Sequence, residues 1–191
     1  MKKFRLVITG NPGVGKHTSA RLVAKKTVAE IIDINSIAIE EGAILKKTGR
    51  GLDVDVKRLT GQLGRLLRSK DDLVIVGHLA PYVLKPAGID MAAVLRRSPY
   101  ELQKTLEGRQ YDYSKVRENV SSEILGVSFY DSVKAFGKRK VAEFDTTGRT
   151  PEQTADEIVA TLRGKSPKRT GFVDWLALIS EKDDIQKFFD Y

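Results

Sequence analysis

The sequence predicts an α/β fold in which a five-stranded parallel sheet lies between two layers of helices. Short apolar runs of strand length alternate with segments of helical spacing along most of the chain. The segment 71–79, DDLVIVGHL, holds a continuous apolar run, as in parallel strands covered on both faces. The first apolar run leads through a glycine-rich turn straight into a helical segment. These observations predict three layers joined by right-handed crossovers.

Each element has its own signal in the sequence. Strands are expected at the apolar runs 4–9, 30–34, 71–79, 91–96 and 140–145. Helices are expected at 16–27, 56–68, 99–108 and 151–162. A further helix should run from Asn35 or Ser36 to Gly42, and one long helix should follow residues 109–119 and end near Phe136. Ser98 with Glu101 and Thr150 with Gln153 match capping boxes, each with proline at the first helical position.

Two stretches lack a clear period. Residues 43–53 are basic and carry two glycines close together, so we expect a mobile loop there. Residues 164–171, GKSPKRTG, are expected to form a basic linker after a domain of residues 1–163.

A helical tail follows the linker at residues 172–191. Two sets of its apolar side chains share helical faces: Phe172, Trp175, Leu176 and Ile179, then Ile185, Phe188 and Phe189. This face either packs back on the domain, which we favour, or binds a partner. Ser180 with Asp183 could restart a helix between the two sets.

The composition excludes several classes of protein. The 191 residues are 41% hydrophobic, and no apolar stretch approaches the length of a membrane span. The apolar run at residues 4–9 is too short for a signal peptide, so we expect a cytoplasmic protein. There are no cysteines, which excludes disulfides, thiolate metal sites and cysteine nucleophiles. Histidine stands only at positions 17 and 78, which argues against a zinc site made by protein ligands alone.

The chain carries a formal net charge of +8. This excess favours anionic partners and is larger than a nucleotide needs. Two interpretations stay open: a basic surface that is simply solvated, or contact with RNA or a ribonucleoprotein.

The turn GNPGVGK at residues 10–16 predicts a phosphate-binding loop. Its glycines let the backbone N–H groups point into one concavity, and the helix that follows adds the positive end of its dipole. Lys16 would reach the outer phosphates of a nucleoside triphosphate. His17 stands where the motif places a magnesium-binding hydroxyl, and Thr18 comes one residue late.

Ligands of parallel α/β sheets bind beyond the carboxyl ends of the strands. The expected topology therefore places the 10–16 turn, Gly77–His78, Arg96–Arg97 and residues 145–148 along one edge. We assign no role to Arg96 and Arg97, for which surface placement is an equal alternative.

Five segments in this order resemble one protein family: GNPGVGK, GLDVD, VIVGH, LEGRQYDYSKVRENVSSEIL and FDTTGRTPEQTADEI. They are similar to the archaeal and eukaryotic adenylate kinases of the isoenzyme-six type, which also serve as small-ribosomal-subunit assembly factors. The resemblance covers about residues 4–163. It implies a P-loop nucleoside monophosphate kinase fold with a monophosphate-binding segment near residues 31–54 and a lid near 108–118.

The resemblance also implies an activity and its partners. It implies phosphoryl transfer from ATP to AMP with Mg²⁺, an ATPase activity used in small-subunit (16S rRNA) maturation, and contact with a small-subunit ribosomal protein and rRNA. A nucleotide-switched assembly factor with weak or vestigial kinase activity is the alternative. The +8 charge favours that alternative, whereas the intact loop and lid arginine favour the kinase.

The resemblance assigns roles to particular residues of this sequence. Gly13, Val14, Gly15, Lys16, His17 and Thr18 occupy the ATP phosphate site, Arg109 is the lid arginine, Asp53 and Asp55 form an acidic pair, and His78 belongs to an acidic-x-His element. His78 would position an attacking or metal-bound water, or would only fill the end of a strand.

Three positions depart from the family pattern. His17 replaces Thr or Ser, Val76 replaces Asp or Glu, and Thr105 stands where many relatives carry an additional lid arginine. Magnesium prefers hard oxygen ligands, so the first two changes remove its usual anchors. Asp33, Asp53 and Asp55 are the remaining carboxylates that could reach the metal through water, and Asp33 is the first candidate among them because it ends a strand near the loop. Thr18 is a further candidate for the metal.

Overall fold

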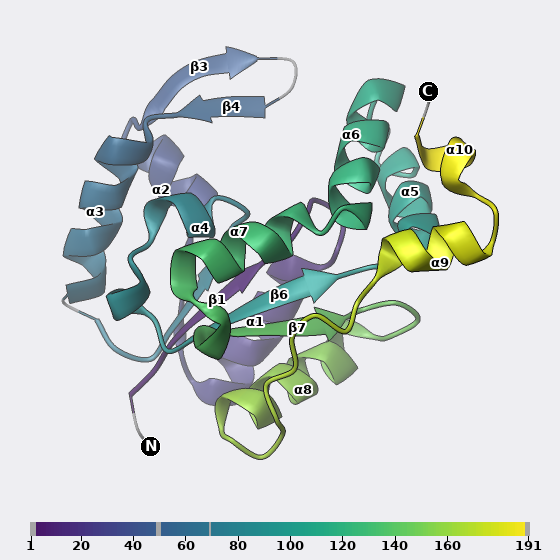
Figure 1. The fold of residues 1–191 in the computed structure, drawn as a ribbon. Helices are drawn as coiled ribbons and strands as arrows, with labels where there is room; N and C mark the ends of the chain where they lie inside the picture. Colours follow the sequence, from purple (N-terminus) through teal and green to yellow (C-terminus); the bar gives the residue numbers. More distant parts are fainter. Residues whose placement is uncertain (1–2, 49–50, 69, 190–191) are drawn as a thin grey trace.

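The computed structural model describes residues 3–48, 51–68 and 70–189. Its main sheet holds five parallel strands in the order β2-β5-β1-β6-β7 (Figure 1). The strands span β1 Arg5–Thr9, β2 Glu30–Asp33, β5 Leu73–Val76, β6 Met91–Arg96 and β7 Val141–Asp145. The predicted three-layer fold and all five of its strands are confirmed.

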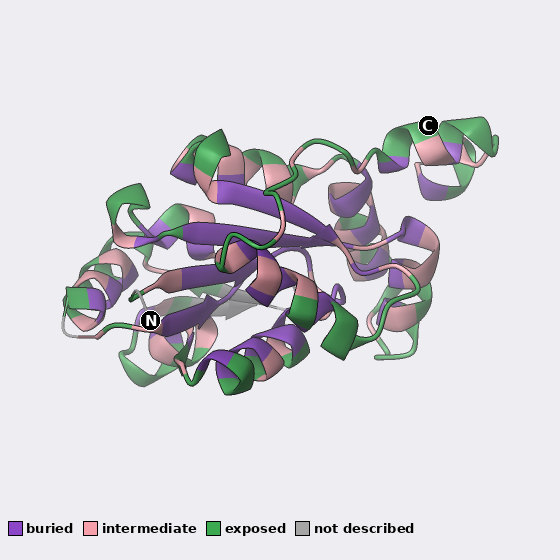
Figure 2. Ribbon diagram, turned by 90° about the horizontal axis from the view of Figure 1, so that it is seen from below, coloured by how far each residue is buried: buried purple, intermediate pink, exposed green. Residues whose placement is uncertain are grey.

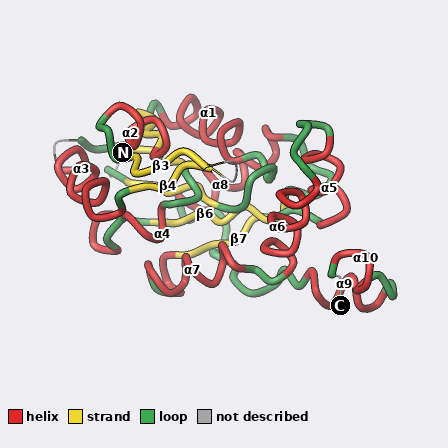
Figure 3. The backbone as a smooth tube through the Cα atoms, turned by 90° about the horizontal axis from the view of Figure 1, so that it is seen from above, coloured by secondary structure: helices red, strands yellow, loops and turns green. Residues whose placement is uncertain are grey.

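The helices lie in layers on the two faces of this sheet. They span α1 Lys16–Thr27, α2 Ile34–Glu40, α3 Val56–Arg68, α4 Ala80–Val83, α5 Pro99–Glu107, α6 Tyr113–Ile124, α7 Val127–Phe136, α8 Pro151–Leu162, α9 Trp175–Glu181 and α10 Ile185–Phe188, with short 3₁₀ turns at Pro86–Gly88 and Lys138–Lys140. Figure 3 shows α1 on one side of the sheet and α7 on the other.

Burial explains why these runs form the central strands. Every residue of β5 and β6 is buried, so the strands need apolar side chains on both faces (Figure 2). One core cluster joins α1, α8, α5 and α6 to the sheet, and a second joins α3, α4 and α7 to it. Gly10 ends β1 at a φ of 134°, where a Cβ would lie 2.4 Å from the Leu95 carbonyl oxygen. The phosphate loop can therefore leave β1 only at a glycine.

The prediction of a loop at residues 43–53 is wrong. Strands β3 Ile44–Thr48 and β4 Gly51–Val54 pair there as an antiparallel hairpin, and residues 49–50 lie outside the described residues. Pairing between the two strands holds this hairpin together. It therefore forms without the regular alternation of apolar residues whose absence led to the prediction of a loop.

The start of α2 also differs from the prediction. Its N-cap is Asp33, whose carboxylate accepts a hydrogen bond from the Asn35 N–H at 2.9 Å, so neither Asn35 nor Ser36 caps it. The cap residue is therefore the last residue of β2.

Two expectations about later helices need correction. The long helix ending at Phe136 is two helices, because Gly126 takes a φ of 66° between α6 and α7. The capping box of Ser98 with Glu101 is wrong: Ser98 makes no side-chain cap of α5, and its N–H donates to Thr147 Oγ1 at 2.8 Å, while the Glu101 carboxylate accepts from Arg97 Nε and Gly148 N. The capping box of Thr150 with Gln153 is confirmed.

The tail packs back on the domain, as favoured above. Trp175, Ile179 and Phe188 are buried in the cluster that contains α5 and α6, whereas Phe172 and Leu176 stay exposed. The next helix, α10, follows Asp184, which makes no side-chain cap, and Ser180 lies within α9. Figure 1 shows α9 and α10 on the side of the molecule away from α3.

Within the part of the chain that the structure describes, no helix is both long enough and apolar enough to cross a membrane.

Candidate nucleotide-binding site

The turn between β1 and α1 forms a tight concave loop. Gly13 has a φ of 93°, and a Cβ on it would lie 2.6 Å from Leu102 Cδ1. The loop therefore lies directly on α5. The Lys16 side chain is only 8% exposed, and its Nζ donates to the Asn11 carbonyl oxygen at 3.0 Å. A bound phosphate oxygen could take over this donor, because the ammonium group has three protons.

A pocket of about 800 Å³ lies over this loop. It is lined by the loop residues Asn11, Gly13, Gly15, Lys16, His17 and Thr18, by Asn35, Ala38, Ile39, Asp53 and Val54 of the segment 31–54, by Arg109, Tyr111 and Lys115 of the lid segment, and by His78. Residues far apart in the sequence thus meet in one cavity, at the carboxyl end of the sheet.

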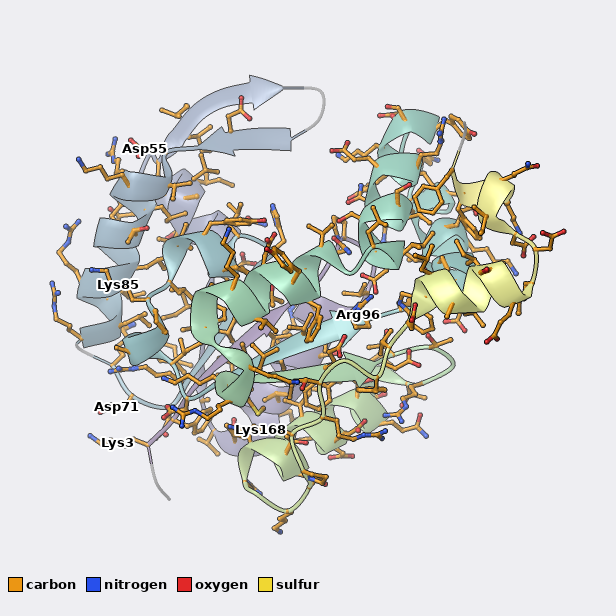
Figure 4. The ribbon with its side chains drawn as sticks, in the orientation of Figure 1. Lys3, Asp55, Asp71, Lys85, Arg96 and Lys168 are labelled. Carbon is orange, nitrogen blue, oxygen red and sulfur yellow. The ribbon has the colours of Figure 1, made fainter. Side chains whose placement is uncertain are left out.

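The remaining candidate residues lie outside the pocket lining. Val14 is buried in the core, so only its backbone could face a ligand. Asp55 accepts from the Arg58 N–H at 2.9 Å at the start of α3, where Figure 4 shows it. Its position indicates a helix cap. Asp33 caps α2 through Oδ1, while its Oδ2 faces His17.

The electrostatics of the pocket centre on Lys16. The pKa of Lys16 is lowered to about 8, mainly by burial and also by the nearby charge of Arg109, against the charges of Glu123 and Asp33, which raise it. The free protein therefore holds an ammonium group that loses its proton much more easily than an exposed lysine does.

We expect ATP binding to take up a proton when the pH exceeds about 8. Phosphate charge favours the ammonium form, so a Lys16 that is neutral in the free protein must be protonated in the complex. Affinity should consequently fall as the pH rises through 8. Calorimetry in buffers of different ionisation enthalpy measures the proton uptake. In Lys16→Ala this uptake should no longer rise with pH. Equal uptake at about pH 7 and about pH 9 would contradict this assignment.

Both histidines lie near Lys16. His17 Nδ1 is 3.6 Å from Asp33 Oδ2, and burial lowers the pKa of His17 more than Asp33 raises it. His78 follows Gly77 at the end of β5, and desolvation together with Lys16 lowers its pKa. Both imidazoles are therefore neutral near pH 7, so each can accept a hydrogen bond at one ring nitrogen and donate one from the other.

The structure offers no ready-made metal cage among its described residues: no group of three or more His, Asp or Glu side chains there is placed to hold an ion. An imidazole stands at position 17, and position 76 is a buried valine. These residues do not supply the hydroxyl and carboxylate oxygens on which magnesium sites of this type depend.

The surface alternative for Arg96 is wrong. Arg96 is 2% exposed and pairs with Glu123 and Glu143 at the end of β6, beside the start of α9 (Figure 4). Arg97 donates from Nη1 to the Gly13 carbonyl oxygen at 3.3 Å, so it supports the phosphate loop from outside the pocket. Sequence reasoning missed both roles, because nothing local in the sequence brings Glu123 or Glu143 to this strand.

The loop and the parallel sheet together define a P-loop fold. A protein-family model described as an AAA domain matches residues 6–126. A shikimate kinase from Bacteroides thetaiotaomicron has the same fold, with a TM-score of 0.59 and 18% identity over 85% of this chain and 99% of that one. A gluconokinase from Sinorhizobium meliloti 1021 matches with a TM-score of 0.56 over 85% of this chain and 93% of its own.

Proteins from archaea are much more similar in sequence. A Thermococcus gammatolerans protein named "Putative adenylate kinase" is 35% identical over 176 residues, which cover 92% of this chain and 95% of that protein. A Methanocaldococcus jannaschii protein of the same name is 32% identical over 98% of this chain and 97% of its own. The chain belongs to the AAA-domain family and to the family of archaeal proteins that bear this adenylate kinase name.

Proposed function

We propose that this protein transfers the γ-phosphoryl group of ATP to AMP. The observation that supports this proposal is the continuous lining of one pocket by the phosphate loop, the segment 108–118 and the segment 31–54. In the proposal, the first binds ATP phosphates, the second closes as a lid, and the third binds the monophosphate. The names of the archaeal relatives agree with this assignment.

Phosphoryl transfer needs positioning and charge stabilisation more than covalent help from the protein. In our proposal, Lys16 and the backbone N–H groups of Gly13, Val14 and Gly15 hold the β- and γ-phosphates. His17 and Thr18 lie at the same phosphate site, and Arg109 balances the charge that spreads onto the transferred group. The cations Lys16, Arg109 and Lys115 line the pocket together.

The acceptor would bind where the segment 31–54 lines the pocket. This segment contributes the apolar Ala38, Ile39 and Val54 together with the polar Asn35 and Asp53, and Leu79 also lines the pocket. Tyr82 and Asp131 line it too, joined by a short hydrogen bond from the tyrosine hydroxyl to the carboxylate. An apolar wall with a few polar groups suits a nucleoside, whose phosphate would then point back to Lys16 and Arg109. His78 would orient the acceptor or an attacking water.

ADP formation from Mg²⁺-ATP, measured with and without AMP, tests the proposal. We expect formation that depends on AMP, with little release of inorganic phosphate. Phosphate release at the same rate with and without AMP would contradict a kinase and would favour hydrolysis.

Asp33 is our candidate for reaching the metal of Mg²⁺-ATP through water. Asp33→Asn keeps an oxygen that can cap α2 and removes only the charge. Mg²⁺ is expected to strengthen ATP binding by the wild type, and we expect Asp33→Asn to lower that gain in affinity about fivefold, which corresponds to about 1 kcal/mol. Turnover at limiting Mg²⁺ should fall by the same factor. Calorimetric titrations of ATP with and without Mg²⁺ measure the first effect.

Asp55→Asn is the matched control for this prediction. Asp55 also caps a helix, at the start of α3. Asp33 differs from it because Asp33 Oδ2 lies 3.6 Å from Nδ1 of His17 in the phosphate site. If Asp33→Asn left turnover of Mg²⁺-ATP unchanged, or if both variants had equal effects, the role of Asp33 would be wrong.

The alternative is a nucleotide-switched assembly factor that binds a small-subunit ribosomal protein and rRNA. The net charge of +8 and the altered magnesium positions favour it. It predicts that rRNA co-purifies with the protein at low salt and dissociates as salt rises. Absence of rRNA and of ribosomal protein at low salt would count against this role.

A further inference from the structure

A buried ionic cluster lies under the phosphate loop, outside the pocket lining. Arg96 donates from Nε to Glu123 Oε1 and from Nη1 to Glu143 Oε1, both at 2.7 Å. The two carboxylate side chains are 0% exposed. One arginine thus faces two buried carboxylates, which need further donors because buried charges are costly when their oxygens lack partners.

The phosphate loop supplies one of these donors. Asn11 Nδ2 donates to Glu123 Oε2 at 2.7 Å. Asn11 Oδ1 accepts from the hydroxyls of Ser122 and Ser128, each at 3.1 Å, and the Asn11 carbonyl oxygen accepts from Lys16 Nζ. Asn11 therefore fixes the loop to α6 and α7 and also holds the lysine of the phosphate site.

The linker and the C-terminal tail supply one more donor each. Trp175 Nε1 donates to Glu123 Oε1 at 3.0 Å, and the Gly171 N–H donates to Glu143 Oε2. Both carboxylates that hold Arg96 thus accept from this C-terminal part of the chain, and one of them, Glu123, also holds Asn11. A continuous chain of hydrogen bonds runs from Trp175 through Glu123 and Asn11 to Lys16.

We propose that Trp175 and Glu123 are positioning residues, which hold Asn11 and thereby keep the loop around Lys16 in its phosphate-binding form. The tail, which the structure describes from residue 172 to 189, is then part of the nucleotide site, although it does not line the pocket. This inference rests on the proposed binding of ATP at the loop. The charge of Glu123 also supports phosphate binding. It raises the pKa of Lys16, which burial lowers, and so favours the ammonium form of the lysine.

The tail has a second anchor that allows a matched control. Tyr100 OH donates to Asp184 Oδ2 at 2.6 Å, and the Tyr100 ring meets the Phe188 ring edge-on at 5.2 Å. This anchor also fixes the tail, but it makes no contact with Glu123. Trp175→Phe and Tyr100→Phe each remove one hydrogen bond of the tail and keep an aromatic ring, and only the first bond leads to the phosphate loop.

Calorimetric titration with ATP separates the two variants. We expect Trp175→Phe to raise the Kd for ATP about three- to tenfold, as the loss of one buried hydrogen bond allows, and Tyr100→Phe to change it less than about twofold. Thermal unfolding of both variants verifies that they are folded and shows how far each loss destabilises them. If Trp175 served only the stability of the fold, each variant would raise the Kd for ATP in proportion to its own loss of stability.

Trp175 is the single tryptophan of the sequence, so its fluorescence reports on the tail alone. Saturating ATP should change the tryptophan emission of the wild type and of Tyr100→Phe with the same midpoint as the calorimetric titration. Unchanged emission, together with equal ATP affinities of the wild type and Trp175→Phe, would overturn the inference. A wild type that binds no ATP would overturn the proposed function and this inference with it, so the two failures are distinguishable.

Discussion

Replacement of Lys16 by alanine is expected to lower AMP-dependent ADP formation by about 100- to 1000-fold, the usual cost of removing one preorganised group that stabilises transition-state charge. Lys16 is buried at the phosphate loop, and its Nζ already points to the loop backbone at Asn11. A rate assay at saturating ATP and AMP measures the loss.

Lys25→Ala is the control for this variant. Lys25 lies in the last turn of the same helix and is exposed, so the same truncation there should leave the rate unchanged. A Lys16→Ala variant within about tenfold of the wild type would show that the loop lysine does not stabilise the transferred group.

Arg96→Leu is expected to destabilise the protein by about 3 to 5 kcal/mol, because it leaves the buried carboxylates of Glu123 and Glu143 without their cation. Leucine keeps apolar volume at the site, so the loss reports mainly on charge. For a chain of this size the melting temperature should fall by about 10 °C. Denaturant unfolding, with the midpoint and slope compared with those of the wild type, measures the effect.

Arg149→Leu provides the comparison at the surface. Arg149 pairs with Glu157, and 44% of the Arg149 side chain and 38% of the Glu157 side chain are exposed. Its loss should cost less than about 1 kcal/mol. Equal effects of the two substitutions would mean that the Arg96 cluster contributes no more than an exposed ion pair.

The parts of the fold that the sequence predicts are those with a local physical signal. The apolar run of residues 73–76 gives a fully buried strand, and Thr150 with Gln153 gives a capping box. The phosphate loop is predicted because its glycines and Lys16 are adjacent in the sequence. His17, His78 and Arg109 then meet at the pocket because the parallel topology brings strand ends to one edge.

The errors arise where distant contacts decide the structure. Glu101 has the spacing of a capping box, yet Arg97 and Gly148 take its carboxylate. Gly126 breaks a stretch with continuous helical character. The ionic cluster of Arg96 joins residues from β6, α6 and β7, and no spacing within the chain announces such an association. These contacts become visible only when the elements are packed together.

The most direct test of the central claim follows the γ-phosphate of ATP carrying a radioactive label. Our account predicts that the wild type transfers the label to AMP, so that it appears in the β-phosphate of ADP, and that Lys16→Ala loses this transfer. Label found only in inorganic phosphate, at a rate that AMP does not change, would contradict it.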